Sequence, residues 1–266
     1  MKSNINLCIS IAGSDPTSGA GIQQDVKTMS KLGVICISII SCITYQNEKG
    51  VFGIYPLSFE VISRQTDVAL KNIKIKFGKT GALGNEDGVK AAIKIIEKYG
   101  VSLVVDPVLQ SKNGFPLLSK GGFELMKKKL IPLSFFLTPN LNEAEKISEI
   151  KIEKKDDILK AGEKISKISK SFVIIKGGHT PEIPQIEKTK IIEDFLFFNG
   201  NFVKSFKKKK SSFQVHGTGC IFSAALSAFL TRGIEPQIAF AKASKWTQKA
   251  IEKSIKITNE GFNIFP

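Results

Sequence analysis

Apolar runs typical of buried strands alternate with helical patterns along most of the chain. Residues 34–43 are almost continuously apolar and rich in β-branched side chains, as expected of a parallel strand that is covered on both faces. They follow an apolar run at 5–11, a glycine-rich loop at 13–21 and a helical pattern at 22–32 that stops at Gly33. Strand, loop, helix and strand in this order begin a βαβ unit. The alternation predicts an α/β fold with a mostly parallel central sheet and helices on both faces.

The same alternation continues through the remainder of the chain. Further strands are predicted at 73–79, 101–105, 135–138 and 172–176, and further helices at 58–72, 87–99, 123–130, 142–148, 156–169, from 217 onward and at 238–257. Residues 44–50 are polar and predict a loop, and 51–55 predict a small extra strand outside the main sheet. Asn199-Gly200, between 191–198 and 201–206, predicts a β-hairpin. Because no repeat or linker interrupts the pattern, we expect one domain spanning residues 1–266.

The composition limits the classes of partner. Of the 266 residues, 42% are hydrophobic and 24% are charged, which is ordinary for a soluble globular protein. No apolar run is long enough to cross a bilayer, and the first ten residues lack the cleavage site of a signal peptide. The net charge of +15 comes from lysines spread along the whole chain, and no nucleic-acid-binding module is present. We therefore expect a cytoplasmic protein that binds neither nucleic acid nor a membrane.

The segment His216-Gly217-Thr218-Gly219-Cys220 runs directly into an apolar helical pattern. Its two glycines leave backbone N–H groups uncovered at the helix N-terminus, where the helix dipole favours an anion. The same field would favour the thiolate form of Cys220, so the segment offers both an anion site and a base. The alternative, equally open from this stretch alone, is a glycine turn before a core helix with Cys220 as an inert thiol.

The other cysteines do not indicate chemistry of their own. Cys8, Cys36 and Cys42 lie inside apolar runs with the pattern of strands. No two of the four cysteines form a C-x-x-C pair, which argues against a disulfide framework and against a zinc site.

Polar and glycine residues follow several of the predicted strands. They are Gly13-Ser14-Asp15, Asp106-Pro107, Thr138-Pro139-Asn140 and Lys176-Gly177-Gly178. In open α/β sheets, ligands bind beyond the carboxyl ends of the strands, so these groups should meet at one edge. Two acids, a lysine and exposed backbone amides suit a polyphosphate bound with Mg²⁺.

Each of these residues also has a purely structural interpretation. Asp106 could simply close a strand before Pro107, Lys176 could be a surface lysine, Asp15 could cap a turn, Asp25 could face solvent, and Gln46 could be a plain loop residue. Asn140 with Glu143 three residues later matches a capping box, which is the favoured interpretation of Glu143 taken alone. Taken singly, each structural interpretation is preferred, and only the set favours a phosphate site.

At this point the chain resembles a known family, the hydroxymethylpyrimidine/phosphomethylpyrimidine kinases of thiamine biosynthesis in the ribokinase-like superfamily. The matching motifs are Ala12-Gly13-Ser14-Asp15, Gly19-Ala20-Gly21-Ile22-Gln23 with Asp25, Thr44 with Gln46-Asn47, Lys79 with Gly81, Val105-Asp106-Pro107-Val108 with Lys112 and Gly114, Thr138-Pro139-Asn140-Leu141 with Glu143-Ala144-Glu145, Lys176-Gly177-Gly178-His179 and His216-Gly217-Thr218-Gly219-Cys220. They occur in the family's order and cover nearly the whole chain.

The resemblance implies a ribokinase-like fold and two successive phosphoryl transfers from ATP, first to 4-amino-5-hydroxymethyl-2-methylpyrimidine and then to its monophosphate. It also implies Mg²⁺ as cofactor and a homodimer. In the substrate site it places Gln46 against the pyrimidine, with Asp25, Gly13 and Ala20 nearby. For the metal and ATP it implies that Asp106 and Glu143 organise magnesium, in part through water, and that Asp106, Lys176, Thr218 and Gly219 bind ATP. For catalysis it implies that Lys176 meets the ATP phosphate, that Gly217 to Cys220 supply the anion hole, and that Cys220 lies near the attacking hydroxyl.

Two residues depart from the family's pattern, and three other functions remain open. Ser18 stands where a glycine is usual and Ala82 where methionine is common, which leaves the substrate preference less defined than the fold. The alternatives are a pyridoxal kinase of the same superfamily, a basic nucleic-acid-binding protein with a degenerate kinase fold, and a regulator that binds the pyrimidine without turnover. Gln46-Asn47 favours the pyrimidine over pyridoxal, and intact Asp106, Lys176 and Cys220 favour an enzyme.

Overall fold

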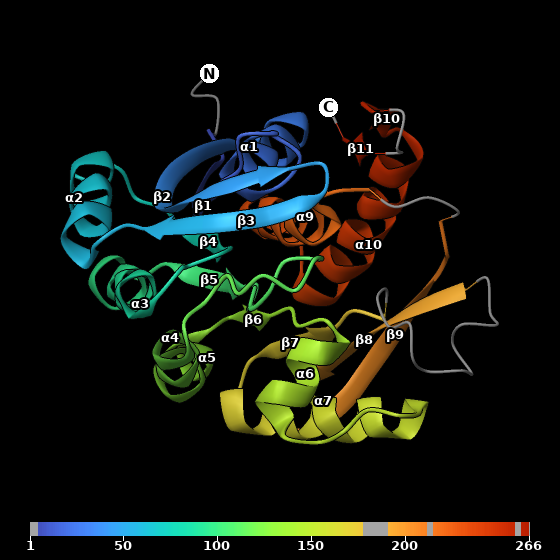
Figure 1. The fold of residues 1–266 in the computed structure, drawn as a ribbon. Coiled ribbons are helices and arrows are strands. Elements are labelled where there is room, and N and C mark those ends of the chain that lie inside the picture. Colours follow the sequence, from blue (N-terminus) through green and yellow to red (C-terminus); the bar gives the residue numbers. More distant parts are fainter. Residues whose placement is uncertain (1–4, 178–190, 212–214, 259–261, 266) are drawn as a thin grey trace.

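The computed structural model describes residues 5–177, 191–211, 215–258 and 262–265, which form a three-layered α/β fold (Figure 1). The strands of its central sheet are, in spatial order, β3 (Gly50–Pro56), β2 (Ile35–Asn47), β1 (Leu7–Ser14), β4 (Phe77–Thr80), β5 (Ser102–Val105), β6 (Phe136–Leu137), β7 (Phe172–Ile175), β8 (Ile191–Phe198) and β9 (Asn201–Lys209). Neighbouring strands in the stretch β2, β1, β4, β5, β6 and β7 pair in parallel. Strand β3 pairs antiparallel with β2, β8 with β7, and β9 with β8. The expected mostly parallel sheet is confirmed.

Helices cover both faces of this sheet, as expected. One face carries α1 (Gly21–Lys31), α9 (Thr218–Thr231) and α10 (Pro236–Glu252). The other carries α2 (Phe59–Ala69), α3 (Glu86–Tyr99), α4 (Lys120–Leu125), a π-helical turn (Met126–Leu130), α5 (Ile131–Leu133), α6 (Leu141–Ser148) and α7 (Lys155–Ser169). The helices predicted from the sequence therefore exist, with ends that differ by a few residues.

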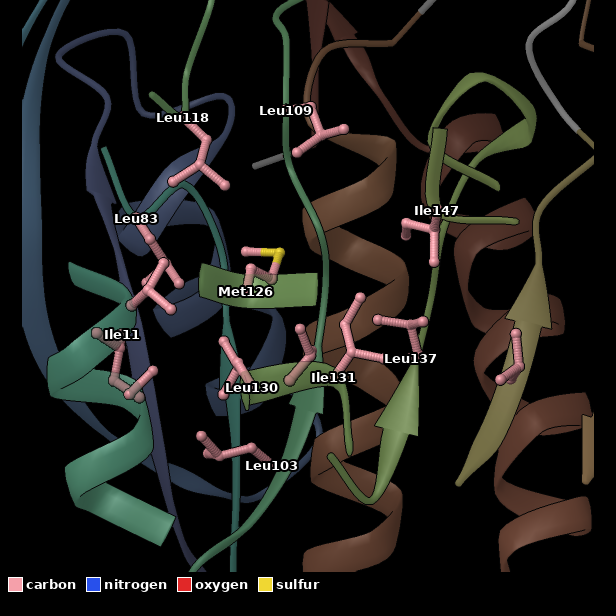
Figure 2. Packing of buried hydrophobic residues seen from close by; sticks show 14 of the residues in the cluster. Ile11, Leu83, Leu103, Leu109, Leu118, Met126, Leu130, Ile131, Leu137 and Ile147 are labelled. Atoms are coloured by element: carbon pink, nitrogen blue, oxygen red, sulfur yellow. The ribbon is translucent and has the colours of Figure 1, made fainter. Parts of the chain in front are cut away.

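Two hydrophobic cores result, because successive side chains of a strand point to opposite faces of a sheet. In β1, Cys8 packs with α9 and α10, whereas Ile9 and Ile11 pack with α2 and α3. Figure 2 shows the second of these cores, in which Ile11, Leu83 and Met126 lie among leucine and isoleucine side chains. Helix α9 is buried on almost every side, from Ile221 to Leu230, which explains why its sequence is apolar apart from Ser223 and Ser227.

The loop that the sequence predicts at residues 44–50 is wrong. Strand β2 continues to Asn47, only Glu48 and Lys49 form the turn, and β3 is the edge strand of the main sheet rather than a strand outside it. Pairing between the strands satisfies the backbone groups whether or not the side chains are polar, and Thr44 is buried with its hydroxyl bonded to the backbone oxygen of Ser14.

Of the hairpin and the terminal helix predicted in the C-terminal part of the chain, the first is confirmed and the second is partly wrong. The hairpin at Asn199-Gly200 is confirmed, with both turn residues at positive φ, and β9 extends three residues beyond the prediction, to Lys209. The predicted terminal helix at 238–257 is too long at its end. Helix α10 stops at Glu252, and β10 (Ile255–Lys256) pairs with β11 (Asn263–Ile264). Pairing with β11, which lies only seven to nine residues further along the chain, takes these residues out of the helix.

No helix in the described part of the chain is long and apolar enough to cross a membrane. The strands β1, β4, β5, β6 and β7 are parallel neighbours, so their carboxyl ends lie along one edge of the sheet. The N-terminus of α9 reaches the same edge, because a Cβ atom on Gly219 would lie 3.7 Å from Asp106 and from Lys176. This edge is where the polar motifs meet.

Candidate active site

The loop after β1 is organised by one buried carboxylate, that of Asp15. Its oxygens accept hydrogen bonds from the backbone N–H groups of Thr17 and Ala20, both at 2.7 Å, and from the Thr17 hydroxyl at 2.8 Å. The ring of His216 lies 3.1 Å from the same carboxylate. Burial works against ionisation, but the contacts with His216 and Thr17 outweigh it and lower the pKa of Asp15 to about 2. The turn-capping interpretation of Asp15 is therefore confirmed.

Close backbone packing joins this loop to the start of α9. Gly217 has a φ of +73°, and a Cβ atom there would lie 2.0 Å from the backbone oxygen of Gly19 and 3.0 Å from the Cα of Ala20. A Cβ on Gly19 would in turn overlap the His216 ring at 2.6 Å. The glycines thus allow two segments, separated by about two hundred residues of sequence, to form one surface with exposed backbone groups.

Asp106 and Lys176 form an ion pair between the ends of β5 and β7. Their oxygen and nitrogen lie 2.9 Å apart, and Asp106 is 2% exposed. The hydroxyl of Thr138 donates to the same carboxylate at 3.2 Å, and that of Ser223 in α9 donates to its other oxygen at 3.2 Å. Although burial opposes its charge, Asp106 and Glu143 hold the pKa of Lys176 above its usual range. Asp106 does directly follow β5, and Lys176 keeps 16% of its side chain exposed, but neither structural interpretation predicts the ion pair between them.

The expectation of a thiolate at Cys220 is wrong for the protein without ligands. Cys220 lies in the first turn of α9, but burial raises the pKa of its thiol to about 11. Lys79 opposes this rise, whereas Asp25 and Asp106 add to it. Burial and two nearby carboxylates outweigh the helix field that the sequence argument considered. The thiol is therefore protonated at neutral pH in this arrangement.

Glu143 has the capping role that the sequence favours for it taken alone. Its backbone N–H donates to the Asn140 side chain at 2.9 Å, and its carboxylate accepts the Asn140 N–H at 2.8 Å, so the capping box of α6 is confirmed. The same carboxyl group also faces the ion pair. Burial first, and then Asp106, raise the pKa of Glu143 to about 7 against the opposing effect of Lys176. The cap thus supplies a second acid beside Asp106.

Asp25 does not face solvent, so that structural interpretation is wrong. It is fully buried on α1, with both oxygens 2.9 Å from the ammonium of Lys79 and one 2.6 Å from the Ser10 hydroxyl. Although burial opposes its charge, Asp25 keeps the pKa of Lys79 above its usual value, and Cys220 and Asp106 contribute less. The charges of the pair act on the Cys220 thiol, whose pKa is lowered by Lys79 and raised by Asp25.

The remaining predicted substrate residues line the start of the same edge. Gln46 is half-buried near the end of β2 and pairs with Val51 of β3. Gly13 closely approaches the neighbouring strand, since a Cβ there would lie 2.7 Å from the sulfur of Cys42. The Gly178 and His179 of the Lys176 motif lie outside the described residues.

Sequence reasoning missed several polar partners of the site. Thr138 was noted only as part of a motif, and the roles of His216, Lys79 and Ser223 were not assigned. Ser223 follows Gly219 by four residues and therefore shares its helix face, which was an available indication.

The fold and this edge define a small-molecule kinase of the ribokinase-like class, in which the ion pair of Asp106 and Lys176 faces a glycine-lined helix N-terminus. The family described as phosphomethylpyrimidine kinase matches residues 15–264. A hydroxymethylpyrimidine/phosphomethylpyrimidine kinase from Bacillus subtilis is 37% identical over 255 residues, covering 96% of this chain and 92% of that protein. The chain belongs to the phosphomethylpyrimidine kinase family.

Solved structures agree in fold along nearly the whole chain. The phosphomethylpyrimidine kinase of Clostridium difficile 630 has a TM-score of 0.78 at 35% identity, covering 92% of this chain and 99% of that one. The pyridoxal kinase of Staphylococcus aureus, solved with pyridoxal, has a TM-score of 0.87 at 29% identity, and its ADP complex one of 0.86 at 30% identity. Both cover 99% of this chain and 94% of that one.

Proposed function

We propose that this chain transfers the γ-phosphoryl group of ATP to the hydroxymethyl oxygen of 4-amino-5-hydroxymethyl-2-methylpyrimidine, and a second one to the resulting monophosphate. Each transfer forms an oxygen–phosphorus bond and releases ADP. The observation that carries the proposal is the Asp106–Lys176 pair, 2.9 Å apart, directly beside Gly219 at the N-terminus of α9. Phosphoryl transfer depends mainly on alignment and charge stabilisation, which a lysine and uncovered backbone N–H groups provide.

The side chains present fit a magnesium ion that is held mainly by phosphate oxygens. No group of three or more His, Cys, Asp or Glu side chains in the described residues is arranged to hold a metal. Asp106 and Glu143 nevertheless place two carboxyl groups around Lys176, and Mg²⁺ typically uses one or two carboxylates together with water and substrate phosphates. When bound, it would neutralise phosphate charge. Asp106 and Glu143 would hold it, in part through its waters.

Cys220 is the proposed base for the first transfer. The proton of the substrate hydroxyl would pass to the Cys220 sulfur as the oxygen attacks phosphorus. The raised thiol pKa of about 11 means that this role requires ligand binding to lower it. Asp106 is one of the groups that raise it, so neutralising the Asp106 charge acts in the required direction. The second transfer starts from an anionic phosphate and needs no base.

We also propose an oligomeric state and a cellular location for the protein. A homodimer is proposed, because Ile43, Tyr45 and Tyr55 leave apolar side chains exposed on β2 and β3, and Ile43 pairs directly with Tyr55. A cytoplasmic location is proposed, because Cys8, Cys36, Cys42 and Cys220 are all free thiols.

Pyridoxal is the second candidate substrate, favoured by the fold similarity to a pyridoxal kinase solved with that compound. Gln46 supports the pyrimidine, because its amide can donate to and accept from a heteroaromatic edge. Product analysis with ATP and Mg²⁺ would compare the two substrates in parallel reactions. Pyrimidine monophosphate followed by pyrophosphate, with little pyridoxal phosphate, is expected. Pyridoxal phosphate as the main product would overturn the substrate assignment, and no product from either would overturn the kinase proposal.

A further inference from the structure

A tight loop between β5 and α4, residues 111–115, projects toward the hairpin that carries Gln46. Its ends are joined by a hydrogen bond from Ser111 N–H to the Phe115 oxygen at 2.9 Å, and Gly114 N–H donates to the Ser111 oxygen at 3.0 Å. The Ser111 hydroxyl also accepts the Phe115 N–H at 3.0 Å. This closed turn presents Asn113 in a defined position, and none of the roles assigned above uses it.

The Asn113 amide binds both backbone groups of one residue in β3. Its oxygen accepts the Val51 N–H at 3.2 Å, and its nitrogen donates to the Val51 oxygen at 2.9 Å. An amide side chain that uses a donor and an acceptor in this way replaces the neighbouring strand that an edge strand lacks. Asn113 therefore fixes the position of Val51 across a sequence separation of 62 residues.

The hairpin is shaped to accept this contact. A Cβ atom on Gly50, which has a φ of +146°, would lie 2.4 Å from the Asn113 amide carbon. Val51 is the register partner of Gln46, and the register of the two strands shifts just before this pair, between Tyr45 and Gln46. A β-bulge commonly re-aims a side chain beside a site. The residue that Asn113 holds is thus the one that pairs with Gln46.

The same loop also contacts the segment that leads into the anion site. The ammonium of Lys112 donates to the Val215 oxygen at 3.1 Å. Val215 is buried and immediately precedes His216, which contacts Asp15. One short loop therefore links the Gln46 hairpin to the start of the phosphate-binding segment.

We propose that residues 111–115 form a clasp between these two parts, and that Asn113 is a positioning residue that sets the affinity for the pyrimidine through Gln46. The inference rests on the proposed contact of Gln46 with the pyrimidine. Asn113 acts on binding of this substrate, and not on the phosphoryl transfer itself. Its removal therefore changes KM for the pyrimidine and leaves kcat and KM for ATP unchanged.

The test compares Asn113→Ala with Asn201→Ala, which removes an asparagine hydrogen bond from the hairpin at the opposite edge of the sheet. Loss of one positioning contact should raise KM for the pyrimidine roughly fivefold, the effect expected of one net hydrogen bond. Asn201→Ala should leave KM unchanged. Hydrogen exchange should accelerate at the Val51 amide of Asn113→Ala without global unfolding. An equal fall in kcat and kcat/KM, or unchanged KM, would overturn the clasp.

The variant Gln46→Ala tests the proposed contact of Gln46 with the pyrimidine separately from the clasp. If Gln46 contacts the pyrimidine, Gln46→Ala raises KM, and adding Asn113→Ala to it raises KM little further, because both act through one contact. Full additivity would overturn the clasp. If Gln46→Ala raises KM but Asn113→Ala does not, only the clasp is wrong. If Gln46→Ala leaves KM unchanged, the pyrimidine role of Gln46 and the clasp with it are wrong.

Discussion

Cys220 shows how opposing effects on a single residue decide its chemistry. Its place in the first turn of α9 favours a thiolate, whereas burial and the carboxylates of Asp25 and Asp106 raise its pKa to about 11. A thiol that stays neutral until ligands bind has a specific advantage for two successive reactions. It places no permanent charge beside the substrate when that substrate is itself a phosphate.

Cys220→Asp is therefore expected to spare the first transfer more than the second. A permanent carboxylate can serve as a base for the alcohol, but repels the phosphate of the second substrate by on the order of 1 kcal/mol or more at close range. The two transfers should be measured separately, starting from the alcohol and from the monophosphate. Cys36→Ser, which changes a cysteine of β2, is the control. Equal losses in both transfers would contradict the idea.

Asp15 is the residue whose charge should govern stability in acid. Its pKa is lowered to about 2 from an ordinary 3.8. A carboxyl group with a lowered pKa stabilises the fold above its unfolded pKa and loses this contribution as pH falls toward the folded value. Between about pH 4 and pH 2 the chain should lose about 2 kcal/mol from this group.

Urea unfolding at a series of pH values checks this expectation. The free energy of unfolding of Asp15→Asn should be lower than that of the unaltered chain at pH 6, and the difference should shrink toward pH 2. A difference that is independent of pH would show that Asp15 acts by shape and not by charge.

At the scale of elements, α9 is flanked by two glycines with similar φ angles, one just before its first residue and one two residues after its last. Gly217 has a φ of +73° and Gly233 one of +76°. A Cβ on Gly217 would lie 2.0 Å from the Gly19 oxygen, whereas a Cβ on Gly233 would meet nothing within 4 Å. The two positions therefore separate backbone strain from the packing of the β1 loop against the helix.

Gly217→Ala should abolish most activity, whereas Gly233→Ala should retain it. The strain of a positive φ costs about 1 kcal/mol at either position, but only the change at Gly217 displaces the loop that lines the phosphate site. We expect kcat/KM to fall at least tenfold for Gly217→Ala, roughly the effect of 1.4 kcal/mol. Comparable kinetics for the two variants would contradict a role for this contact.

Some features of the helices and strands can be predicted from residues close in sequence, and others cannot. The Asn199-Gly200 hairpin and the Asn140–Glu143 capping box depend on neighbouring residues and were predicted from them. The extent of β2 was not, because its polar end is stabilised by pairing with β3 and by a hydrogen bond from Thr44 to the Ser14 oxygen, on another strand. The residues after α10 pair as strands β10 and β11, which the helical pattern at 238–257 does not indicate.

At the scale of the whole molecule, the buried pair of Asp25 and Lys79 joins α1 to β4. Both side chains are fully buried, and each oxygen of Asp25 lies 2.9 Å from the ammonium. Lys79→Met should lower the free energy of unfolding by about 3–5 kcal/mol, because it leaves a buried carboxylate without its partner.

A second substitution and an exposed pair provide the controls. Adding Asp25→Asn to Lys79→Met should recover much of the loss, since no buried charge then remains. Lys90→Met breaks an exposed pair with Asp87 and should change stability by no more than about 1 kcal/mol. A small effect of Lys79→Met alone would contradict the importance of this pair.

The proposed homodimer can be tested on the exposed face of β2 and β3. Tyr45→Lys with Tyr55→Lys places two charges on the apolar surface and should convert a dimer into a monomer in analytical ultracentrifugation. Ile168→Lys, on α7, is a control at another exposed apolar residue. A dimer that survives the double substitution would place the interface elsewhere.

The α/β class, the order of strands and helices, and the motifs that meet beyond the strands can all be predicted from the residues alone. They follow from hydrophobic periodicity and from the turns and helix caps that residues close in sequence form. The pairing of Asp25 with Lys79, the contact of Asp15 with His216, and the raised pKa of Cys220 become evident only in the folded chain. Burial and long-range contacts determine those charges, and neither can be read from residues close in sequence.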